Sequence, residues 1–469
     1  MREQSQAPVA IDLLVRADFL YPMSEGLPII RDGEVAVRDG RILYAGARQP
    51  EGHWRAGEVI SGRGKAVLPG LVNCHNHAAS LIFRSQTDGK STVGLYKVAF
   101  RMEREITDET WALTGLLGCI DMLRAGITTI NDIWYNPEGL ARAVEVTGLR
   151  AFIANKVFDV KLENLLHDDY TRYPELGAAR LRHGVEFAET WHGRAGGRIM
   201  ARMGTHASDT CDPGLHVEAR READRLGIGM HIHAAQSERE RRHIQENHGK
   251  GPLEYLRDIG LLRDDVVCAH LLQAGEGDLA AMVETGAGYA CCPGLYPRHA
   301  IFPDLPKMLA AGVRTGFGTD WMTNDPFEGM RSAMNVLRVT KGDDQVLPCD
   351  EALWFQTMGS ARILGLADEI GSLEAGKKAD LIVIDLEKPH LQPFYGDYSA
   401  LVYYAKSSDV VTTVIDGKPV MRDGRILGVD EGEVMRALTA ALPQWATTLH
   451  RYGGNIAGGA DFACACCAP

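Results

Sequence analysis

Histidines and one aspartate stand at the ends of several short apolar runs in this sequence: His75, His206, His233, His270 and Asp320. If these runs are parallel strands of a barrel, the side chains at their carboxyl ends meet at one mouth. His77 lies two residues after His75, so both side chains point to the same face of a strand. Imidazole and carboxylate groups are ligands that zinc prefers. We therefore predict one divalent metal ion bound by His75, His77, His233 and Asp320.

The other groups of this cluster are expected to transfer protons or to support the ligands. Asp320 is predicted to be both a ligand and the general base, because a carboxylate beside a metal-activated water can accept its proton. His270 is expected to be a second proton carrier or an orienting donor. His231 and His233 form a second His-x-His pair, but two ligands from each pair would crowd the ion, so we interpret His231 as structural. Zn²⁺ is the default ion, although Fe²⁺, Mn²⁺ and Co²⁺ accept similar ligands.

Short β-branched or apolar runs alternate with longer amphipathic stretches, which is the pattern of repeated strand and helix units around a parallel sheet. We count eight such runs, at 67–75, 128–134, 151–159, 199–206, 229–235, 266–272, 288–294 and 314–320. No Gly-x-Gly-x-x-Gly motif follows any of them, so the eight units favour a closed (β/α)8 TIM barrel of the α/β class. A doubly wound open sheet is the alternative.

The two ends of the chain show a different pattern of short alternating runs broken by turns. Asp39 and Gly40 form a hairpin signal, and the pentapeptide DGRIL occurs at 39–43 and again at 423–427. We predict that residues 1–66 and 372–435 form one small β-sandwich. The barrel is assigned to residues 67–371, and a C-terminal helix with a cysteine-containing tail to residues 436–469.

Several longer motifs contain these histidines and the aspartate. They are PGLVNCHNH (69–77), GTHASDTC (204–211), MHIHAAQS (230–237), CAHLLQ (268–273) and GFGTDWMTND (316–325), followed by GSLEAGKKADLIVID near the C-terminal end. Together the motifs extend over nearly the whole chain. They resemble the amidohydrolase superfamily, and within it the branch of guanine deaminase, S-adenosylhomocysteine deaminase and the triazine hydrolases.

The resemblance implies a mononuclear site, usually of zinc, at which an activated water attacks a trigonal carbon and expels ammonia or another leaving group. Binuclear relatives have a carboxylated lysine at the end of strand four, but the run 199–206 contains no lysine. By its position in the motifs, His206 is expected to contact the substrate, and Glu103 matches a ribose-binding glutamate. The family also implies a homodimer or a larger homo-oligomer.

Gln236 departs from the family pattern, which has a glutamate three residues after the strand-five ligand, here His233. In the family that glutamate carries a proton to the ring nitrogen of the substrate. Glutamine exchanges hydrogen bonds but does not carry a proton at ordinary pH. Glu238 and Glu240 are near in sequence, but their spacing does not place them on the same turn as Gln236. The candidate catalytic residues are therefore Asp320, His270 and Gln236.

Three functions remain open at this point. We favour hydrolytic deamination of an aminated N-heterocycle of purine, pterin or triazine type, which is chemistry on a carbon–nitrogen bond other than a peptide bond. Hydrolysis of an amide, a carbamate or thiocarbamate, or a carbon–chlorine bond is the alternative, because Gln236 replaces the usual glutamate. A catalytically inactive binding protein is the third, although all four metal ligands and the base are present.

Aromatic side chains near the motifs favour a flat small-molecule substrate. The candidates for stacking on a heterocycle are Phe83, Tyr96, Phe100, Trp134 and Trp321. The loop 84–104 is expected to cover the site. The predicted substrate contacts are His206, Glu103 and Trp321.

Composition argues against several classes of partner. The formal net charge of −12 and the pI near 5.8 do not fit a nucleic-acid surface. No apolar run reaches the roughly 20 residues of a membrane span, and no signal peptide opens the chain, so we predict a cytoplasmic protein. The ten cysteines lack paired CxxC spacing, and we interpret Cys464, Cys466 and Cys467 as exposed thiols without a metal or redox role.

Overall fold

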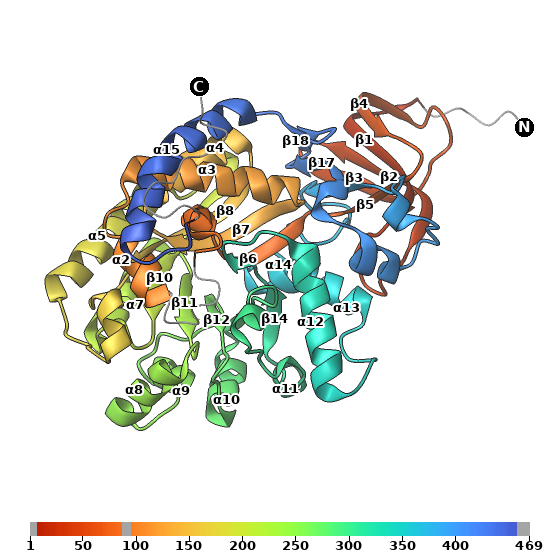
Figure 1. Cartoon of the computed structure of the whole chain (residues 1–469). Coiled ribbons are helices and arrows are strands. Elements are labelled where there is room, and N and C mark those ends of the chain that lie inside the picture. The colour runs from red at the N-terminus through yellow and green to blue at the C-terminus, as the bar shows by residue number, and fades with distance from the viewer. Residues whose placement is uncertain (1–6, 87–94, 457–469) are drawn as a thin grey trace, which may run out of the picture.

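The eight apolar runs form a ring of parallel strands in the computed structural model of the chain, which describes residues 7–86 and 95–456 (Figure 1). The strands are β6 (Leu71–His77), β7 (Ile127–Trp134), β8 (Arg150–Val157), β10 (Met203–Ala207), β11 (Met230–Ala234), β12 (Val266–His270), β13 (Gly288–Cys291), β14 (Arg314–Phe317) and β15 (Asp320–Trp321), with the short β9 (Ile199–Ala201) beside β8. Neighbours pair in this order, and β15 pairs with β6. The strand order therefore closes, which confirms the predicted (β/α)8 barrel over an open sheet.

The eighth run is interrupted, and the interruption closes the ring. β14 pairs with β13, whereas β15 pairs with β6. Between them the N–H of Gly318 donates to the carbonyl of Cys291 at 2.7 Å, and the N–H of Thr319 donates to the carbonyl of His75 at 3.0 Å. A Cβ at residue 318 would lie 2.7 Å from the carbonyl oxygen of His75, so glycine is needed for this approach.

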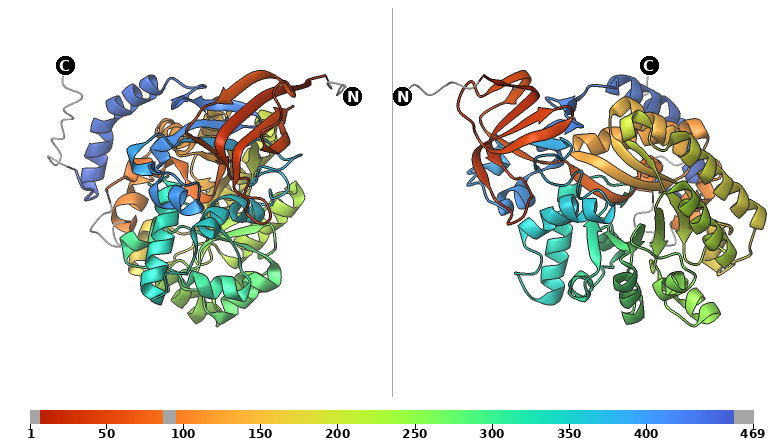
Figure 2. Two further views of the ribbon diagram at one scale, coloured as in Figure 1. Left: turned by 90° about the vertical axis from the view of Figure 1, so that its right-hand side faces the viewer. Right: turned by 180° about the vertical axis from the view of Figure 1, so that it is seen from behind.

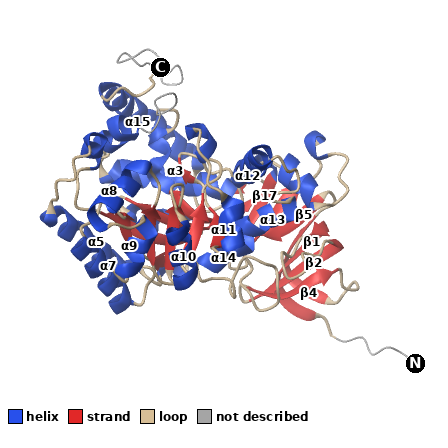
Figure 3. Ribbon diagram, turned by 90° about the horizontal axis from the view of Figure 1, so that it is seen from below, coloured by secondary structure: helices blue, strands red, loops and turns tan. Residues whose placement is uncertain are grey.

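Helices surround the ring of strands, as the view from below shows (Figure 3). The longer ones are α3 (Asp108–Arg124), α4 (Pro137–Thr147), α5 (Pro174–Trp191), α7 (Pro213–Leu226), α8 (Glu238–His248), α9 (Pro252–Asp258), α10 (Glu276–Thr285), α11 (Leu305–Ala311) and α12 (Pro326–Lys341). Shorter helical turns are η1 (Ala78–Phe83), η2 (Leu95–Ala99), α2 (Phe100–Met102), η3 (Leu162–His167), α6 (Arg194–Gly197), η4 (Tyr296–His299), α13 (Cys349–Trp354), η5 (Phe355–Gly359), α14 (Ser360–Ile363), η6 (Pro389–Leu391), η7 (Ala400–Tyr404) and η8 (Ser407–Asp409). Proline opens α4, α5, α7, α9 and α12, because the first turn of a helix does not use that N–H.

The two ends of the chain join in a second, mixed sheet beside the barrel, seen from two further sides in Figure 2. Its strands are β1 (Val9–Leu20), β2 (Ile30–Arg38), β3 (Arg41–Ala47), β4 (Trp54–Ser61), β5 (Lys65–Pro69), β16 (Leu381–Asp385), β17 (Val410–Ile415), β18 (Lys418–Arg422) and β19 (Arg425–Ile426). The N-terminal and C-terminal parts meet where β5 pairs antiparallel with β16.

One detail differs from the sequence analysis. The run 67–75 is not one barrel strand, because the chain passes at Gly70 from β5 of the small sheet to β6 of the barrel. A Cβ at residue 70 would clash with the side chain of Thr128, which explains a glycine at this crossing. The two DGRIL segments lie in this same sheet, in β3 and β19 at opposite ends of its strand order.

The last described element is α15 (Glu431–Arg451), which packs against α3 on the outside of the barrel (Figure 1). The predicted thiols Cys464, Cys466 and Cys467 lie outside the described residues. Within residues 7–86 and 95–456, the cysteines are buried and free. None of the helices in this part of the chain has the length and apolar character needed to cross a membrane.

Candidate active site

A cavity at the carboxyl ends of the barrel strands is lined by most of the side chains that the sequence analysis selected: His77, His206, His233, Gln236, His270, Asp320 and Trp321. His75 is fully buried directly behind this lining. Its Nε2 atom lies 3.5 Å from Oδ1 of Asp320. The structure therefore brings groups from strands far apart in sequence to one point.

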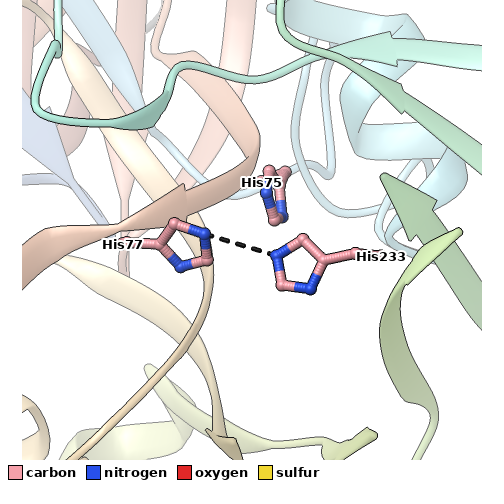
Figure 4. A group of neighbouring side chains, drawn as sticks. All are labelled: His75, His77 and His233. Carbon is pink, nitrogen blue, oxygen red and sulfur yellow. Dashed lines mark hydrogen bonds between the residues drawn. The ribbon is translucent and has the colours of Figure 1, made fainter. Parts of the chain in front are cut away.

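The three candidate ligand histidines lie close together (Figure 4), and hydrogen bonds on their far sides set the orientation of their rings. Nδ1 of His77 donates to the carbonyl of Ile133 at 2.7 Å, and Nδ1 of His233 donates to the carbonyl of His206 at 2.5 Å. Both rings therefore present an unprotonated Nε2 to the centre, the form that binds a metal. Nδ1 of His75 lies 2.8 Å from Nε2 of His231. His231 thus supports His75 from outside the cluster.

The donor atoms of the cluster fit a tetrahedral ion. Nε2 of His77 lies 3.4 Å from Nε2 of His233 and 3.3 Å from Oδ1 of Asp320. Ligand atoms about 2.0 to 2.1 Å from a tetrahedral zinc ion lie about 3.3 to 3.4 Å from one another. Nε2 of His75 is buried and has no hydrogen-bond partner among the described residues. A bound cation would satisfy this atom, so the cluster fits the family's metal.

The electrostatics of the cavity favour neutral imidazoles around one carboxylate. Burial lowers the pKa of His77 to about 4 and the pKa of His270 to about 3. Burial alone would raise the pKa of Asp320, but the neighbouring imidazoles of His270, His75 and His77 hold that pKa well below its usual range. At neutral pH the cluster therefore offers one negative charge and several lone pairs, which is a cation site.

The backbone is unusual at two of the proposed catalytic groups. His270 has a φ of 85° and Asp320 a φ of 61°, both in the left-handed region that residues other than glycine rarely occupy. Such conformations cost about 1 to 3 kcal/mol each and persist where the surrounding structure enforces them, often at active sites. Here they bring Nδ1 of His270 to 3.7 Å from Oδ2 of Asp320.

Gln236 lines the cavity, and a buried glutamate supports its backbone. The carboxylate of Glu240 accepts hydrogen bonds from the N–H groups of Ala235 and Gln236 at 3.0 and 2.7 Å, and from Oγ of Ser208 at 2.5 Å. From the sequence spacing alone, Glu240 was not expected on the same turn as Gln236. The contact arises because Gln236 precedes α8, and the first turn of that helix directs the carboxylate back to the free N–H groups.

Glu103 is not among the residues that line the cavity; it lines a neighbouring one. Its carboxylate accepts a hydrogen bond from the hydroxyl of Tyr135 at 2.6 Å and pairs with Nζ of Lys156 at 3.7 Å. Lys156, on β8, is the member of this pair that reaches the cavity. Burial raises the pKa of Glu103 and lowers the pKa of Lys156 to about 8, while the attraction between the two groups opposes both shifts.

Of the five candidate aromatic residues, Phe100, Trp134 and Trp321 line the cavity. Phe83 is fully buried beside Trp321, with 5.9 Å between the ring centroids, and is not part of the lining. The side chain of Tyr96 and part of the loop 84–104 lie outside the described residues.

Three lining residues with polar groups were missed by the sequence analysis: Lys156, Tyr296 and His299. Lys156 had a detectable signal, because a lysine inside the apolar run 151–159 must be buried with its charge. Tyr296 and His299 belong to η4, a turn after β13 whose position no local pattern predicts.

Comparison with known proteins agrees with the resemblance seen in the motifs. The profile of the amidohydrolase family matches residues 66–420. The chain belongs to this amidohydrolase family. The 5-methylthioadenosine/S-adenosylhomocysteine deaminase of Desulforudis audaxviator is 36% identical over 432 residues, which cover 90% of this chain and 96% of the relative. The 5'-deoxyadenosine deaminase of Methanosarcina acetivorans is 34% identical over 438 residues, covering 92% and 98% of the two chains.

Solved structures of related proteins have the same fold. An adenosine deaminase from Xanthomonas campestris with bound zinc has a TM-score of 0.84 and 26% identity, covering 95% of this chain and 100% of that one. An atrazine chlorohydrolase from Arthrobacter aurescens TC1 in complex with zinc has a TM-score of 0.82 at 19% identity, covering 92% and 100%. This amidohydrolase is therefore a metal-dependent enzyme that acts on carbon–nitrogen bonds other than peptide bonds.

Proposed function

We propose that this amidohydrolase hydrolytically deaminates an aminated N-heterocycle of purine type, with one zinc ion bound by His75, His77, His233 and Asp320. The three histidines form one group of neighbouring donor atoms, and Asp320 adjoins two of them, His75 and His77. The observation that carries the proposal is the spacing of the donor atoms, 3.3 to 3.5 Å from Oδ1 of Asp320 to Nε2 of His77 and His75. The purine type follows the relatives named above, whose substrates are adenosine derivatives.

His75, His77, His233 and Asp320 would hold the ion, which would lower the pKa of a bound water towards neutrality and so provide a nucleophile at ordinary pH. Asp320 accepts the proton of the attacking water, because its buried carboxylate is ionised and lies among the candidate ligands, with Oδ1 3.3 Å from Nε2 of His77. His270, at 3.7 Å from that carboxylate, orients the water and relays the proton towards the departing amine. Trp134 and Phe100 hold the flat ring from the sides, and His206 contacts it from β10.

Gln236 gives a specific reason to keep a second candidate function. Its side chain lies in the cavity at the position where the family resemblance places a proton-carrying glutamate. An amide, a carbamate or a carbon–chlorine bond has no ring nitrogen that must be protonated by that residue. Hydrolysis of such a bond is therefore the second candidate.

Removal and restoration of the metal test the proposed function directly. The purified protein is expected to contain about one zinc ion per chain and to release ammonia from at least one compound of a panel of aminopurines and their nucleosides. Chelation should abolish ammonia release, and one equivalent of Zn²⁺ should restore it, as measured by a coupled ammonia assay with metal analysis. Metal-dependent turnover of amides or carbamates alone would favour the second candidate, and a protein without metal would contradict the proposed site.

Gln236→Ala should have a small effect on deamination. If Gln236 only exchanges a hydrogen bond with the ring, its loss lowers kcat/KM by about 2- to 12-fold, the range of one neutral hydrogen bond. Gln245→Ala, on the exposed part of the same helix α8, is the matched control and should leave kcat/KM unchanged. A loss above a hundredfold for Gln236→Ala would show that Gln236 takes part in the chemical step.

A further inference from the structure

Lys156 is the buried cation of the cavity and has no role in the mechanism above. Its side chain is 1% exposed, and it lines the cavity that holds the histidine cluster. Burying an ammonium is unfavourable unless acceptors surround it. Its three N–H groups therefore need hydrogen-bond acceptors. A ligand would have to supply the acceptors that the protein itself does not provide.

The described residues supply Lys156 with only weak partners. Its Nζ lies 3.7 Å from Oε1 of Glu103, beyond normal hydrogen-bond distance. That oxygen has no hydrogen-bond partner within the described part of the chain. The other partners are aromatic faces, with Nζ 4.2 Å from the ring centre of Trp134 and 4.9 Å from that of Tyr135. Ring faces attract the charge but accept no conventional hydrogen bond.

The position of the Lys156 ammonium restricts which ligand atoms it can contact. Trp134 adjoins both Lys156 and the histidine cluster, because its ring centre lies 4.5 Å from the ring centre of His77 and 4.2 Å from Nζ of Lys156. Lys156 and the histidine cluster line the same cavity, so a flat substrate bound at the cluster occupies the cavity that the ammonium also borders.

We propose that Lys156 donates a hydrogen bond to an oxygen on the ring of the substrate, so that the preferred substrate is an oxo-substituted, acidic aminoheterocycle rather than a neutral aminopurine. This inference deepens the proposed function and rests on it. The oxygen is a carbonyl or enolate, and charge on it strengthens the hydrogen bond from an ammonium. Burial leaves the pKa of Lys156 at about 8, so the group is mainly charged at neutral pH.

The same contacts argue against recognition of a ribose by Glu103. Ribose hydroxyls are donors that a free carboxylate would accept. Here one carboxylate oxygen already accepts the hydroxyl of Tyr135, the other faces Lys156, and the side chain lines the neighbouring cavity. The family resemblance predicts that the acidic Glu103 contacts the substrate. In this structure the basic Lys156 lines the cavity instead.

Equilibrium binding separates this inference from the proposed function, because it needs no turnover. The zinc-loaded enzyme is titrated calorimetrically at pH 7 with urate, an anionic oxopurine without an amino group, and with the neutral hypoxanthine. The wild type is expected to bind urate more tightly. Lys156→Met should weaken urate binding by about 10- to 100-fold, the range of a hydrogen bond to a charged group, and change hypoxanthine binding by less than about threefold. A steady-state version of this experiment compares kcat/KM for guanine and 8-oxoguanine between the wild type and Lys156→Met.

Lys161→Met is the matched control, since Nζ of Lys161 also lies over an aromatic ring, 4.7 Å from the centre of Tyr173, but Lys161 lines the neighbouring cavity. It should leave both ligands unaffected. Equal loss of urate and hypoxanthine in Lys156→Met would mean that Lys156 only shapes the cavity, and would overturn the proposal. If that variant fails to fold, Lys156→Gln decides: this side chain is neutral but still polar, so urate binding should weaken while hypoxanthine binding stays unchanged, and equal loss of both ligands would overturn the proposal.

The experiments distinguish failure of the proposed deamination from failure of the proposed role of Lys156. Lys156-dependent binding of urate without ammonia release from any heterocycle would refute deamination and leave the ligand assignment intact. Ammonia release from neutral aminopurines with no effect of Lys156→Met would support deamination and refute the role of Lys156.

Discussion

Asp320→Asn is expected to lower kcat by about 10²- to 10⁴-fold, the contribution of a positioned general base. The amide keeps an oxygen that can bind the ion but no longer accepts a proton. Asp320 is buried, with Oδ1 3.3 Å from Nε2 of His77 and Oδ2 3.7 Å from Nδ1 of His270. The check is steady-state ammonia release, normalised to the zinc content of each preparation.

Asp304→Asn provides the control for this experiment. Asp304 caps α11 through a hydrogen bond from the N–H of Lys307 at 3.2 Å, and asparagine caps helices equally well. Its kcat should therefore match the wild type. An Asp320→Asn enzyme that holds one metal per chain and keeps its kcat would show that another group is the base.

Arg150→Met is expected to destabilise the fold by about 3 to 5 kcal/mol, the usual loss when one partner of a buried ion pair is removed. Arg150, at the start of β8, donates to both carboxylate oxygens of Asp380 at 3.1 Å and to Asp416 at 2.6 Å. Both Arg150 and Asp380 are 2% exposed, so the variant leaves a buried carboxylate unpaired between the barrel and the small sheet. Chemical unfolding followed by tryptophan fluorescence measures the effect.

Arg41→Met is the matched control. Arg41 pairs with Glu369 at 2.9 Å, but both side chains are well exposed, at 47% and 38%. Exposed ion pairs contribute about 0 to 1 kcal/mol, so this variant should unfold close to the wild type. The double variant Arg150→Met/Asp380→Asn should recover part of the loss, because it also removes the unpaired charge. Equal stability of Arg150→Met and Arg41→Met would show that the buried pair does not hold the two parts together.

The barrel and the position of the metal cluster were predictable because both follow from local patterns. Strand periodicity places His75 and His77 on one face, and the parallel arrangement brings Asp320 to the same end as His233. Gln236 was also recognisable, since it lies at a fixed spacing from His233 on the same short segment. Each of these inferences needs only neighbours in sequence and the geometry of one strand.

Contacts between distant segments were not predictable in this way. Glu103 seemed a substrate contact by its motif, yet the packing of η2 and α2 against the strands places it against Tyr135 and leaves Lys156 in the cavity. Likewise, the run 67–75 looks like one strand, and only the neighbouring Thr128 shows why it divides at Gly70. Side-chain distances of this kind depend on how whole elements pack, which no spacing along the chain encodes.

The sequence by itself therefore determined the family, the barrel and the set of metal-binding candidates, because strand periodicity and motif spacing are local properties. The tertiary structure decided which polar side chains share the cavity, how His231 and Glu240 support their neighbours, and that a lysine lines the cavity. The physical reason is that burial and hydrogen bonding act between elements brought together only by folding.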